Sequence, residues 1–172
     1  IQKALIMGEI MKLCKSYRST FEITDFSQRI QTNHELEPII RHGEPPAILR
    51  FEDVKQEILG IFSIISSFKK SGYTSLGIVC KTETQARELS ESLRVHTGDI
   101  HFLSNQSSAF MKGIIVTSSH MAKGLEFDEV IVPYVNAKNY NSAIDKSMLY
   151  VAVTRAMHRL TLTYNGRPSE FI

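Results

Sequence analysis

The pattern of hydrophobic and polar positions along the chain changes between two periods. Hydrophobic side chains at 54, 58, 61, 62, 65 and 68 recur every three or four residues, so the spacing predicts a helix over 52–70 with one buried face. Continuous apolar runs at 75–80, 113–118 and 129–135 predict strands that are covered on both faces. The remaining expected elements are helices over 20–30, 82–94 and between the strands at 129–135 and 159–164, strands over 9–14, 47–51, 100–103 and 159–164, and a loop over 32–46.

The alternation of strands with helices predicts a fold class. It is typical of βαβ units, so we expect an α/β three-layer sandwich with a mostly parallel central sheet. With 172 residues, of which 42% are hydrophobic, the chain is long enough for a full core, and we expect 1–172 to form a single domain. Because the sequence opens on Ile1, we expect that domain to be a fragment of a longer protein. Ligands of parallel sheets bind beyond the carboxyl ends of strands, so we look for functional residues in the loops there.

Composition excludes few classes of function. A net charge of +2 is too small to indicate nucleic acid by itself. Cys14 and Cys80 lie far apart, which favours two buried thiols in a reducing compartment over a disulfide or a metal site. Asp128 and Glu129 precede their apolar run instead of following it, so we predict no metal there.

No apolar run approaches the roughly 20 residues of a membrane span, and no signal peptide is visible, so we expect a cytoplasmic protein.

The stretch "KSYRST" follows the first expected strand and begins the first expected helix. The amino end of a helix favours anions, so together with Arg18 it would make a phosphate site. Tyr17 could stack on a base. The alternative is a surface arginine beside a packed tyrosine.

The stretch "SSHMAKGLEFDEV" follows the apolar run 113–118. Gly124 allows close backbone approach to a ligand, and Glu126 could accept a sugar hydroxyl. The side chains of Ser118 and His120 could donate to the phosphates or sugars of a nucleic acid. The alternatives are a satisfied structural histidine and, for Lys123, a solvated charge.

A charged residue interrupts the apolar stretch "MLYVAVTRAMHRLTL". On a helical wheel Arg155 lies between Ile144 and Met148 and close beside Val151. An unpaired charge on a buried face costs several kcal/mol, so the guanidinium needs an anion. A local carboxylate such as Asp145 is one candidate, and a phosphate from a bound ligand is the other.

The chain contains no GxxxxGK[ST] sequence. That motif forms the P-loop, which holds a nucleoside triphosphate and its Mg²⁺. The domain therefore lacks its own P-loop, and it can supply arginines to a nucleotide but not the phosphate cradle.

Three segments taken together resemble a known family. "YRST" at 17–20, "SSHMAKGLEFDEVIV" at 118–132 and "LYVAVTRAMHRLTLTY" at 149–164 resemble motifs IV, V and VI of the second RecA-like domain (domain 2A) of superfamily 1 helicases of the UvrD/Rep type, in family order and spacing. Ser118 stands where threonine is usual, which keeps the hydroxyl. The short path from Leu93 to Ser118 leaves no room for the large subdomain inserted in UvrD and Rep, so the HelD (helicase IV-like) branch is the most similar.

The resemblance implies a RecA-like fold and a role for each motif residue. Tyr17 would stack on adenine, and Glu126 would bind the ribose. Arg18 and Arg155 would reach the γ-phosphate, so Arg155 would act as an arginine finger toward ATP on a neighbouring domain. Gly124 would shape the loop.

The resemblance also implies DNA contacts. Ser118 and His120, with Lys123 beside them, would face single-stranded DNA or couple it to the nucleotide. The whole protein would be an ATP-dependent DNA helicase or translocase acting on single-stranded or partly duplex DNA. ATP and Mg²⁺ would be held by an N-terminal RecA-like domain that this chain lacks, so the isolated domain should be inactive. The alternative is a HelD-like ATPase that remodels or recycles RNA polymerase. A helicase–nuclease is less favoured, because no Asp/Glu/Lys cluster follows motif VI.

Overall fold

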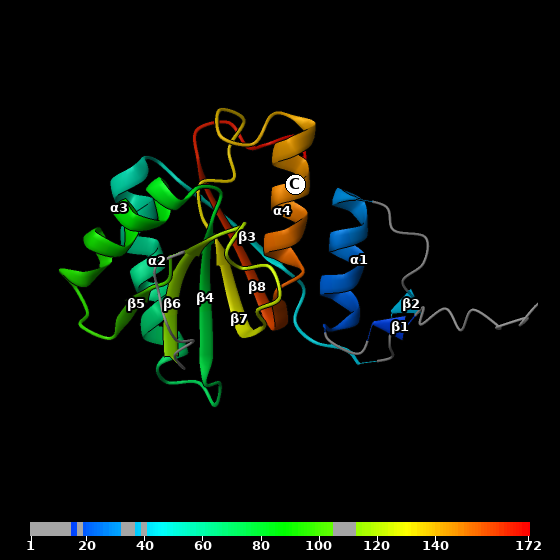
Figure 1. The fold of residues 1–172 in the computed structure, drawn as a ribbon, viewed down its shortest axis with the longest axis horizontal. Coiled ribbons are helices and arrows are strands. Elements are labelled where there is room, and N and C mark those ends of the chain that lie inside the picture. The colour runs from blue at the N-terminus through cyan, green and yellow to red at the C-terminus, as the bar shows by residue number, and fades with distance from the viewer. Residues whose placement is uncertain (1–14, 17–18, 32–36, 39–40, 105–112) are drawn as a thin grey trace, which may run out of the picture.

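The computed structural model describes residues 15–16, 19–31, 37–38, 41–104 and 113–172. In these residues six strands form one sheet in the order β3-β8-β7-β4-β6-β5, and every pairing within it is parallel (Figure 1). The strands are β3 (Ala47–Phe51), β4 (Ser75–Cys80), β5 (Ile100–Phe102), β6 (Gly113–Ser118), β7 (Phe127–Val132) and β8 (Ala156–Asn165). The short strands β1 (Lys15–Ser16) and β2 (Glu37–Pro38) form a separate parallel pair.

Helices cover both faces of the sheet (Figure 1). On one side α1 (Phe21–Ile30) packs against α4 (Ala143–Val153), and these two helices contact β7 and β8. On the other side α2 (Val54–Phe68) packs against α3 (Glu83–Arg94), and these contact β3, β8 and the strands from β4 to β6. The predicted α/β three-layer architecture with a parallel central sheet is therefore confirmed.

The two faces of the sheet bury separate hydrophobic cores. The larger core lies beneath α1 and α4 and includes Phe127, Tyr140 and Leu149. The other core lies beneath α2 and α3 and includes Ile61 and Ile78. The central strands supply side chains to both cores, which explains why their sequences show no polar alternation.

Side-chain caps fix where three of the helices begin. The Asp53 carboxylate accepts a hydrogen bond from the main chain of α2. Thr82 with Gln85 and Ser142 with Asp145 form capping boxes at the starts of α3 and α4. In each box the first hydroxyl accepts from the third helical N–H, and the side chain of that third residue accepts from the main chain of the cap. These pairs could be read from the sequence spacing alone.

Four details differ from the sequence predictions or lie outside the described residues. The strand expected over 129–135 starts and ends earlier, at Phe127–Val132. Val54, expected on the buried face of α2, is 50% exposed. The segment expected as a loop contains β2. Cys80 is buried as predicted, and that burial raises the pKa of its thiol. The strand expected over 9–14, with Cys14, lies outside the described residues.

A buried carboxylate joins the carboxyl ends of β7 and β8 to α2. Glu57 is completely buried. Its oxygens accept hydrogen bonds from the main-chain N–H of Tyr134 at 2.8 Å, the hydroxyl of Thr163 at 2.6 Å and the amide of Asn165 at 2.6 Å. Such a group is tolerated in a core only when its acceptor oxygens are satisfied. The hydrophobic pattern of α2 did not predict it.

The described residues contain neither a helix that could span a membrane nor a cluster that could hold a metal ion. None of the helices there combines the length and the apolar character that crossing a membrane requires. In the same part of the chain, His, Cys, Asp and Glu side chains form no group of three or more that could hold a metal ion.

Candidate functional site

The loop that joins β6 to β7 carries four of the predicted site residues, His120, Lys123, Gly124 and Glu126, and it runs from the edge of the sheet at the carboxyl ends of the strands to the edge at their amino ends. It leaves Ser118, which pairs with Cys80 at the carboxyl end of β4. It reaches Phe127, which pairs with Ala156 at the amino end of β8. The six residues of β4 separate these edges by about 16 Å. The loop therefore connects two distinct regions of the surface.

Main-chain hydrogen bonds hold this loop in a fixed shape. The N–H and the hydroxyl of Ser119 both donate to the carbonyl oxygen of Cys80, at 2.8 and 3.0 Å. The N–H of Ala122 donates to Ser118, and the side chain of Ala122 is fully buried. Gly124 has φ of +88°, and a Cβ there would meet nothing within 4 Å. The glycine is therefore required by the backbone conformation rather than by a neighbouring atom.

The loop ends beside Arg155. The N–H of Phe127 donates to the carbonyl oxygen of Arg155 at 3.0 Å, and the guanidinium Nη1 donates to the carbonyl oxygen of Leu125 at 3.3 Å. Glu126, between these two loop residues, is exposed. Glu126 and Arg155 therefore lie at the same edge of the sheet. That edge is the amino end of β7 and β8, so the expectation of a site at the carboxyl ends is wrong for this pair.

Arg155 lies after the end of α4 and not within it. The helix ends at Val153, and Thr154 is its cap. The guanidinium Nε donates to the carbonyl oxygen of Val151 at 3.1 Å, and Nη2 contacts the Thr154 hydroxyl at 3.2 Å. The side chain is partly exposed. The helical wheel was therefore wrong here, because it continued the helix two residues too far.

The local carboxylate considered as a partner of Arg155 has another partner. Asp145 lies in the first turn of α4, whereas Arg155 follows the last turn. The Asp145 carboxylate forms an ion pair with Lys81, with an N–O distance of 2.7 Å.

The segment with the other predicted arginine is described only in part. Tyr17 and Arg18 lie outside the described residues. The hydroxyl of Ser19, the next residue, donates to the carbonyl oxygen of Ala156 at 2.6 Å. The start of α1 is thereby joined to the residue that follows Arg155. The roles of Tyr17 and Arg18 stay predictions.

The predicted DNA-contacting residues lie toward the carboxyl edge. Ser118 is buried, and its hydroxyl is 3.5 Å from the N–H of Met121. His120 and Lys123 are exposed and line a pocket of about 190 Å³ between the loop and α4. The burial of Ser118 leaves His120 and Lys123 as the two predicted residues that a strand of DNA could reach from solvent.

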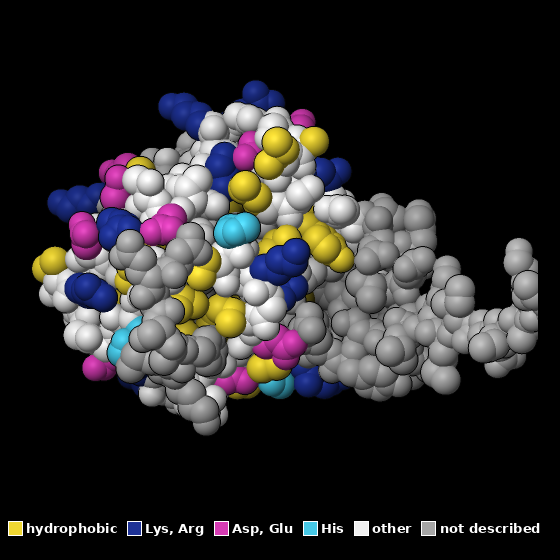
Figure 2. Space-filling model, in the orientation of Figure 1, with side chains coloured by type: hydrophobic (Ala, Val, Ile, Leu, Met, Phe, Trp, Pro, Cys, Tyr) yellow, Lys and Arg dark blue, Asp and Glu magenta, His cyan; other side chains and the backbone are white. Residues whose placement is uncertain are grey.

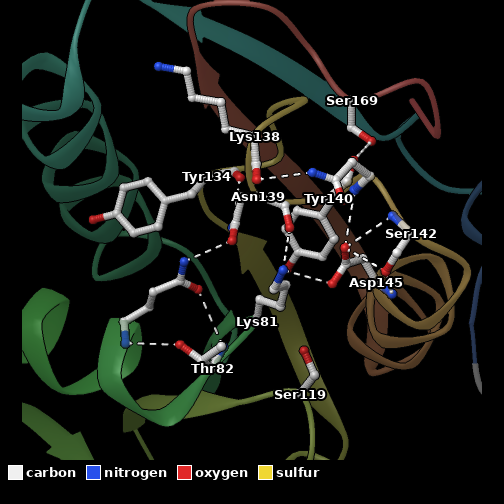
Figure 3. Close-up of polar contacts among 12 residues, drawn as sticks. Lys81, Thr82, Ser119, Tyr134, Lys138, Asn139, Tyr140, Ser142, Asp145 and Ser169 are labelled. Atoms are coloured by element: carbon white, nitrogen blue, oxygen red, sulfur yellow. Dashed lines mark hydrogen bonds and ion pairs between the residues drawn. The ribbon is translucent and has the colours of Figure 1, made fainter.

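A polar network at the carboxyl edge was not predicted (Figure 3). Lys81 follows β4 directly, and its ammonium contacts both Asp145 and the carbonyl oxygen of Asn139. The same ammonium lies 5.7 Å from the centre of the Tyr140 ring. The Asn139 side chain accepts from the amide of Gln85 on α3. The network therefore joins β4, α3, α4 and the segment after β7. The sequence feature that could have indicated this network is a lysine directly after a buried strand.

The charge of Asp145 is strongly favoured in the folded protein. Burial alone would raise the pKa of this carboxyl group. The hydrogen bonds from Lys81, Ser142 and the main chain of Asn141 outweigh the burial and lower the pKa to about 2.

The Asp128 carboxylate joins the amino end of β7 to the start of β4. One oxygen of Asp128 accepts hydrogen bonds from the N–H and hydroxyl groups of Thr74 and Ser75, at distances from 2.8 to 3.1 Å. Burial alone would raise the pKa of Asp128, but these bonds outweigh it and lower the pKa below its usual range. All four donors belong to the start of β4, so Asp128 has a structural role there.

Arg159 of β8 forms ion pairs with two carboxylates, one in the segment before β3 and one on β7. Its guanidinium lies 2.8 Å from Glu44 and 3.3 Å from Glu129, and it lies over the Tyr73 ring with its centre 5.3 Å away. Arg159 thus has local ion-pair partners, and its contacts are those of a structural arginine.

Comparison with known proteins shows what the domain is similar to. Residues 113–163, from β6 into β8, match the family of UvrD-like helicase C-terminal domains. The chain is similar to the C-terminal domain of a possible DNA helicase from Lactobacillus plantarum WCFS1, with 29% identity, coverage of 91% of each chain and a TM-score of 0.77. The fold is accordingly that of a helicase C-terminal, RecA-like domain. The predicted resemblance is confirmed at this level, and the HelD branch stays a prediction.

A second solved structure is more distant. The helicase nonstructural protein 10 of an arterivirus, in complex with DNA, shows 13% identity and a TM-score of 0.47, over 70% of this chain and 28% of that one. The comparison with curated proteins finds no match.

Proposed function

We propose that this chain is the second motor domain of an ATP-dependent DNA helicase or translocase, which we call the parent protein. In this proposal the 172 residues form one domain, and an N-terminal RecA-like domain of the parent protein supplies the P-loop and the Mg²⁺ site. The observation that carries the proposal is the position of Arg155. Its guanidinium is held by main-chain carbonyls at the amino edge of β7 and β8, next to Glu126 and the start of α1.

The residues at this edge fit the polyphosphate and ribose of a nucleotide. Arg155 offers a planar cation that is partly exposed and would contact an anion from a neighbouring domain. Glu126 offers an exposed carboxylate to sugar hydroxyls. When bound, ATP would supply the transferable phosphoryl group. Arg155 would stabilise the negative charge that develops during phosphoryl transfer, and Arg18 would assist.

The opposite end of the same loop fits a role with DNA. His120 and Lys123 are exposed near the carboxyl edge, and Gly124 separates them from the Glu126 end of the loop. Ser118 and Ala122 anchor the first part of the loop through hydrogen bonding and burial. The loop would therefore couple DNA at one edge to nucleotide at the other, about 16 Å away. Within this proposal, the HelD-like alternative, with RNA polymerase as the partner, rests on the short path between Leu93 and Ser118.

The test compares the parent protein with this chain. The parent protein should hydrolyse ATP, and single-stranded DNA should increase the rate. The 172-residue chain alone should bind ATP weakly and show no turnover above background, because it has no P-loop. Steady ATP turnover by the purified chain, or no effect of DNA on the parent protein, would contradict the proposal.

A further inference from the structure

A pocket of about 270 Å³ lies at the amino edge of the sheet. Its walls come from the residue before α1, the segment 41–44 before β3, Tyr73 before β4 and the start of β8. Neither Glu126 nor Arg155 lines it. Arg159, which does, follows Arg155 by four residues, or up to about 13 Å at the spacing of a strand. The described residues that line this pocket have no role in the nucleotide or DNA contacts proposed above.

Two side chains of this pocket carry buried donor atoms that make no hydrogen bond with any described residue. They are the hydroxyl of Thr20 and the Nε of Arg159. Thr20 is only 2% exposed, and although it is the N-cap of α1, its side chain makes no capping hydrogen bond. The Nη1 and Nη2 atoms of Arg159 bind Glu129 and Glu44, so Nε is the donor that remains. Unpaired buried donors are costly, so two at one pocket indicate a ligand that accepts hydrogen bonds.

The charges around the pocket favour an anion. Two arginines and two histidines line it, against one carboxylate, that of Glu44. The pocket also lies at the amino end of α1, which favours negative charge. At the lower edge of Figure 2, below the start of β7 and β8 in Figure 1, a histidine lies among acidic and basic side chains. Guanidinium groups match the oxygens of phosphate, so this anion is most simply a phosphate.

The segment before β3 holds the pocket in a fixed shape. The N–H of Phe21 donates to the carbonyl oxygen of Arg41 at 2.9 Å, and the N–H of Gly43 donates to the Glu22 carboxylate at 2.8 Å. A Cβ at Gly43 would lie 2.6 Å from the Thr20 methyl group, so only glycine lets the segment close over Thr20. The donors are therefore positioned before a ligand arrives, which lowers the cost of binding.

The other arginine of the pocket is also fixed by the main chain. The Nη2 atom of Arg41 donates to the carbonyl oxygen of Met157 at 2.7 Å. Pockets for drug-sized molecules measure roughly 300–1,000 Å³, so this smaller pocket suits an ion with a few waters better than a whole nucleotide.

We propose that this pocket binds a free phosphate ion, which accepts hydrogen bonds from the Thr20 hydroxyl, the Arg159 Nε–H and the Arg41 guanidinium. The site is separate from the γ-phosphate contacts of Arg155. The inference does not rest on the proposed function, because it concerns a ligand of the 172-residue chain alone.

NMR spectra of the arginine Nε–H groups test the proposal directly. The ¹⁵N-labelled chain is titrated with sodium phosphate, and separately with sodium chloride at the same ionic strength and pH. The Arg159→Lys variant assigns the signal. We expect the Arg159 Nε–H signal to shift with phosphate, to saturate at millimolar concentration and to stay unchanged with chloride. The signal of Arg29, which is 75% exposed and pairs with Asp25, should not follow the phosphate titration.

A third titration, with ADP, separates free phosphate from the phosphate groups of a nucleotide. We expect ADP to shift the Arg159 signal only at higher concentration than phosphate does, because the pocket is too small for the whole nucleotide. Binding of ADP at lower concentration than phosphate would assign the pocket to the nucleotide and overturn the inference.

Two threonine variants on α1 provide a matched comparison. Thr20→Val should weaken phosphate binding about fivefold, the effect of one hydrogen bond, without lowering the melting temperature, because the hydroxyl has no partner to lose. The hydroxyl of Thr24 donates to the carbonyl oxygen of Thr20 at 3.0 Å, and Thr24 does not line the pocket. Thr24→Val should therefore lower the melting temperature slightly and leave phosphate affinity unchanged.

Three results would overturn the inference. The first is an Arg159 signal that does not respond to phosphate at millimolar concentration or responds equally to chloride. The second is the same phosphate affinity in Thr20→Val as in wild type. The third is a lower melting temperature for Thr20→Val without phosphate, because the hydroxyl would then have a structural partner such as a buried water. The ATPase test of the parent protein is independent of all three.

Discussion

The Nη1 atom of Arg155 lies 3.3 Å from the carbonyl oxygen of Leu125. This hydrogen bond joins the turn after α4 to the loop before β7. The Nε atom of the same side chain donates to the carbonyl oxygen of Val151 at 3.1 Å. Both acceptors are main-chain atoms of well-anchored elements, so the orientation of the guanidinium is set by the fold before any nucleotide arrives. Such preorganisation is what stabilisation of a transition state requires.

Two glycines should respond differently to alanine. Gly124→Ala should destabilise the chain by about 1–2 kcal/mol, because φ is +88° but no atom lies near the added Cβ. Gly77→Ala places a Cβ 2.4 Å from the buried ring of Phe127, so the core must shift and the cost should be larger, about 2–3 kcal/mol or more. Urea unfolding of both variants measures the difference. Equal losses of stability would contradict the assigned roles of the two residues.

Asp128→Ala should destabilise the chain by about 2–3 kcal/mol, because it leaves the donors of Thr74 and Ser75 without their charged acceptor. Asp99→Ala is the control. Asp99 pairs with Lys69 at 2.9 Å, but its side chain is 79% exposed, so its removal should destabilise the chain much less than that of Asp128. Thermal melting of the two variants is the measurement. A loss as small for Asp128 as for Asp99 would show that the four hydrogen bonds contribute little.

The Lys81–Asp145 pair should make stability depend on pH in acid. The pKa of Asp145 falls from 3.8 to about 2 on folding, so its contribution is present above pH 3.8 and is lost as pH falls through 2. The loss should be about 2 kcal/mol. In Lys81→Met the pKa should lie nearer its ordinary value, so this loss should shrink.

The measurement is the free energy of unfolding between pH 5 and pH 2, for wild type and Lys81→Met together. Other carboxyl groups titrate in the same range, so the difference between the two proteins is the informative quantity. Parallel curves would contradict the assignment of the low pKa to this ion pair.

The fold was largely predictable because its signals are local. The apolar runs of β4 and β6 and the stripe of α2 identify their elements directly. The ends of elements were less certain, since the pattern continued the last helix to Arg155, whereas it ends at Val153. The two faces of α4 could not be distinguished in sequence, because Ile144 and Leu149 are both hydrophobic and only the packing of the sheet decides which is buried.

The candidate site was predictable where one segment carries it. The loop after β6 carries Gly124 at a positive φ and brings Glu126 to the same edge as Arg155, and the roles of these residues toward nucleotide stay predictions. The Lys81–Asp145 pair joins residues 64 positions apart, so no local pattern could reveal it. The segment with Tyr17 and Arg18 lies outside the described residues, and its role rests on the resemblance alone.

The most direct test of the account is the ATPase rate of the parent protein with Arg155→Lys. Lysine keeps the charge but loses the planar fork, so kcat should fall at least about 10²-fold, whereas the affinity for ATP should change much less. The melting temperature should change little, because the partly exposed side chain contributes hydrogen bonds rather than core packing. Arg167→Lys, an exposed arginine after β8, is the matched control and should leave kcat unchanged.

Steady-state kinetics and thermal melting of wild type, Arg155→Lys and Arg167→Lys, measured side by side with saturating single-stranded DNA, give the answer. The account predicts a folded Arg155→Lys protein with a kcat reduced at least about 10²-fold. An unchanged kcat, or a variant that fails to fold, would contradict it, because Arg155 would then be a structural residue.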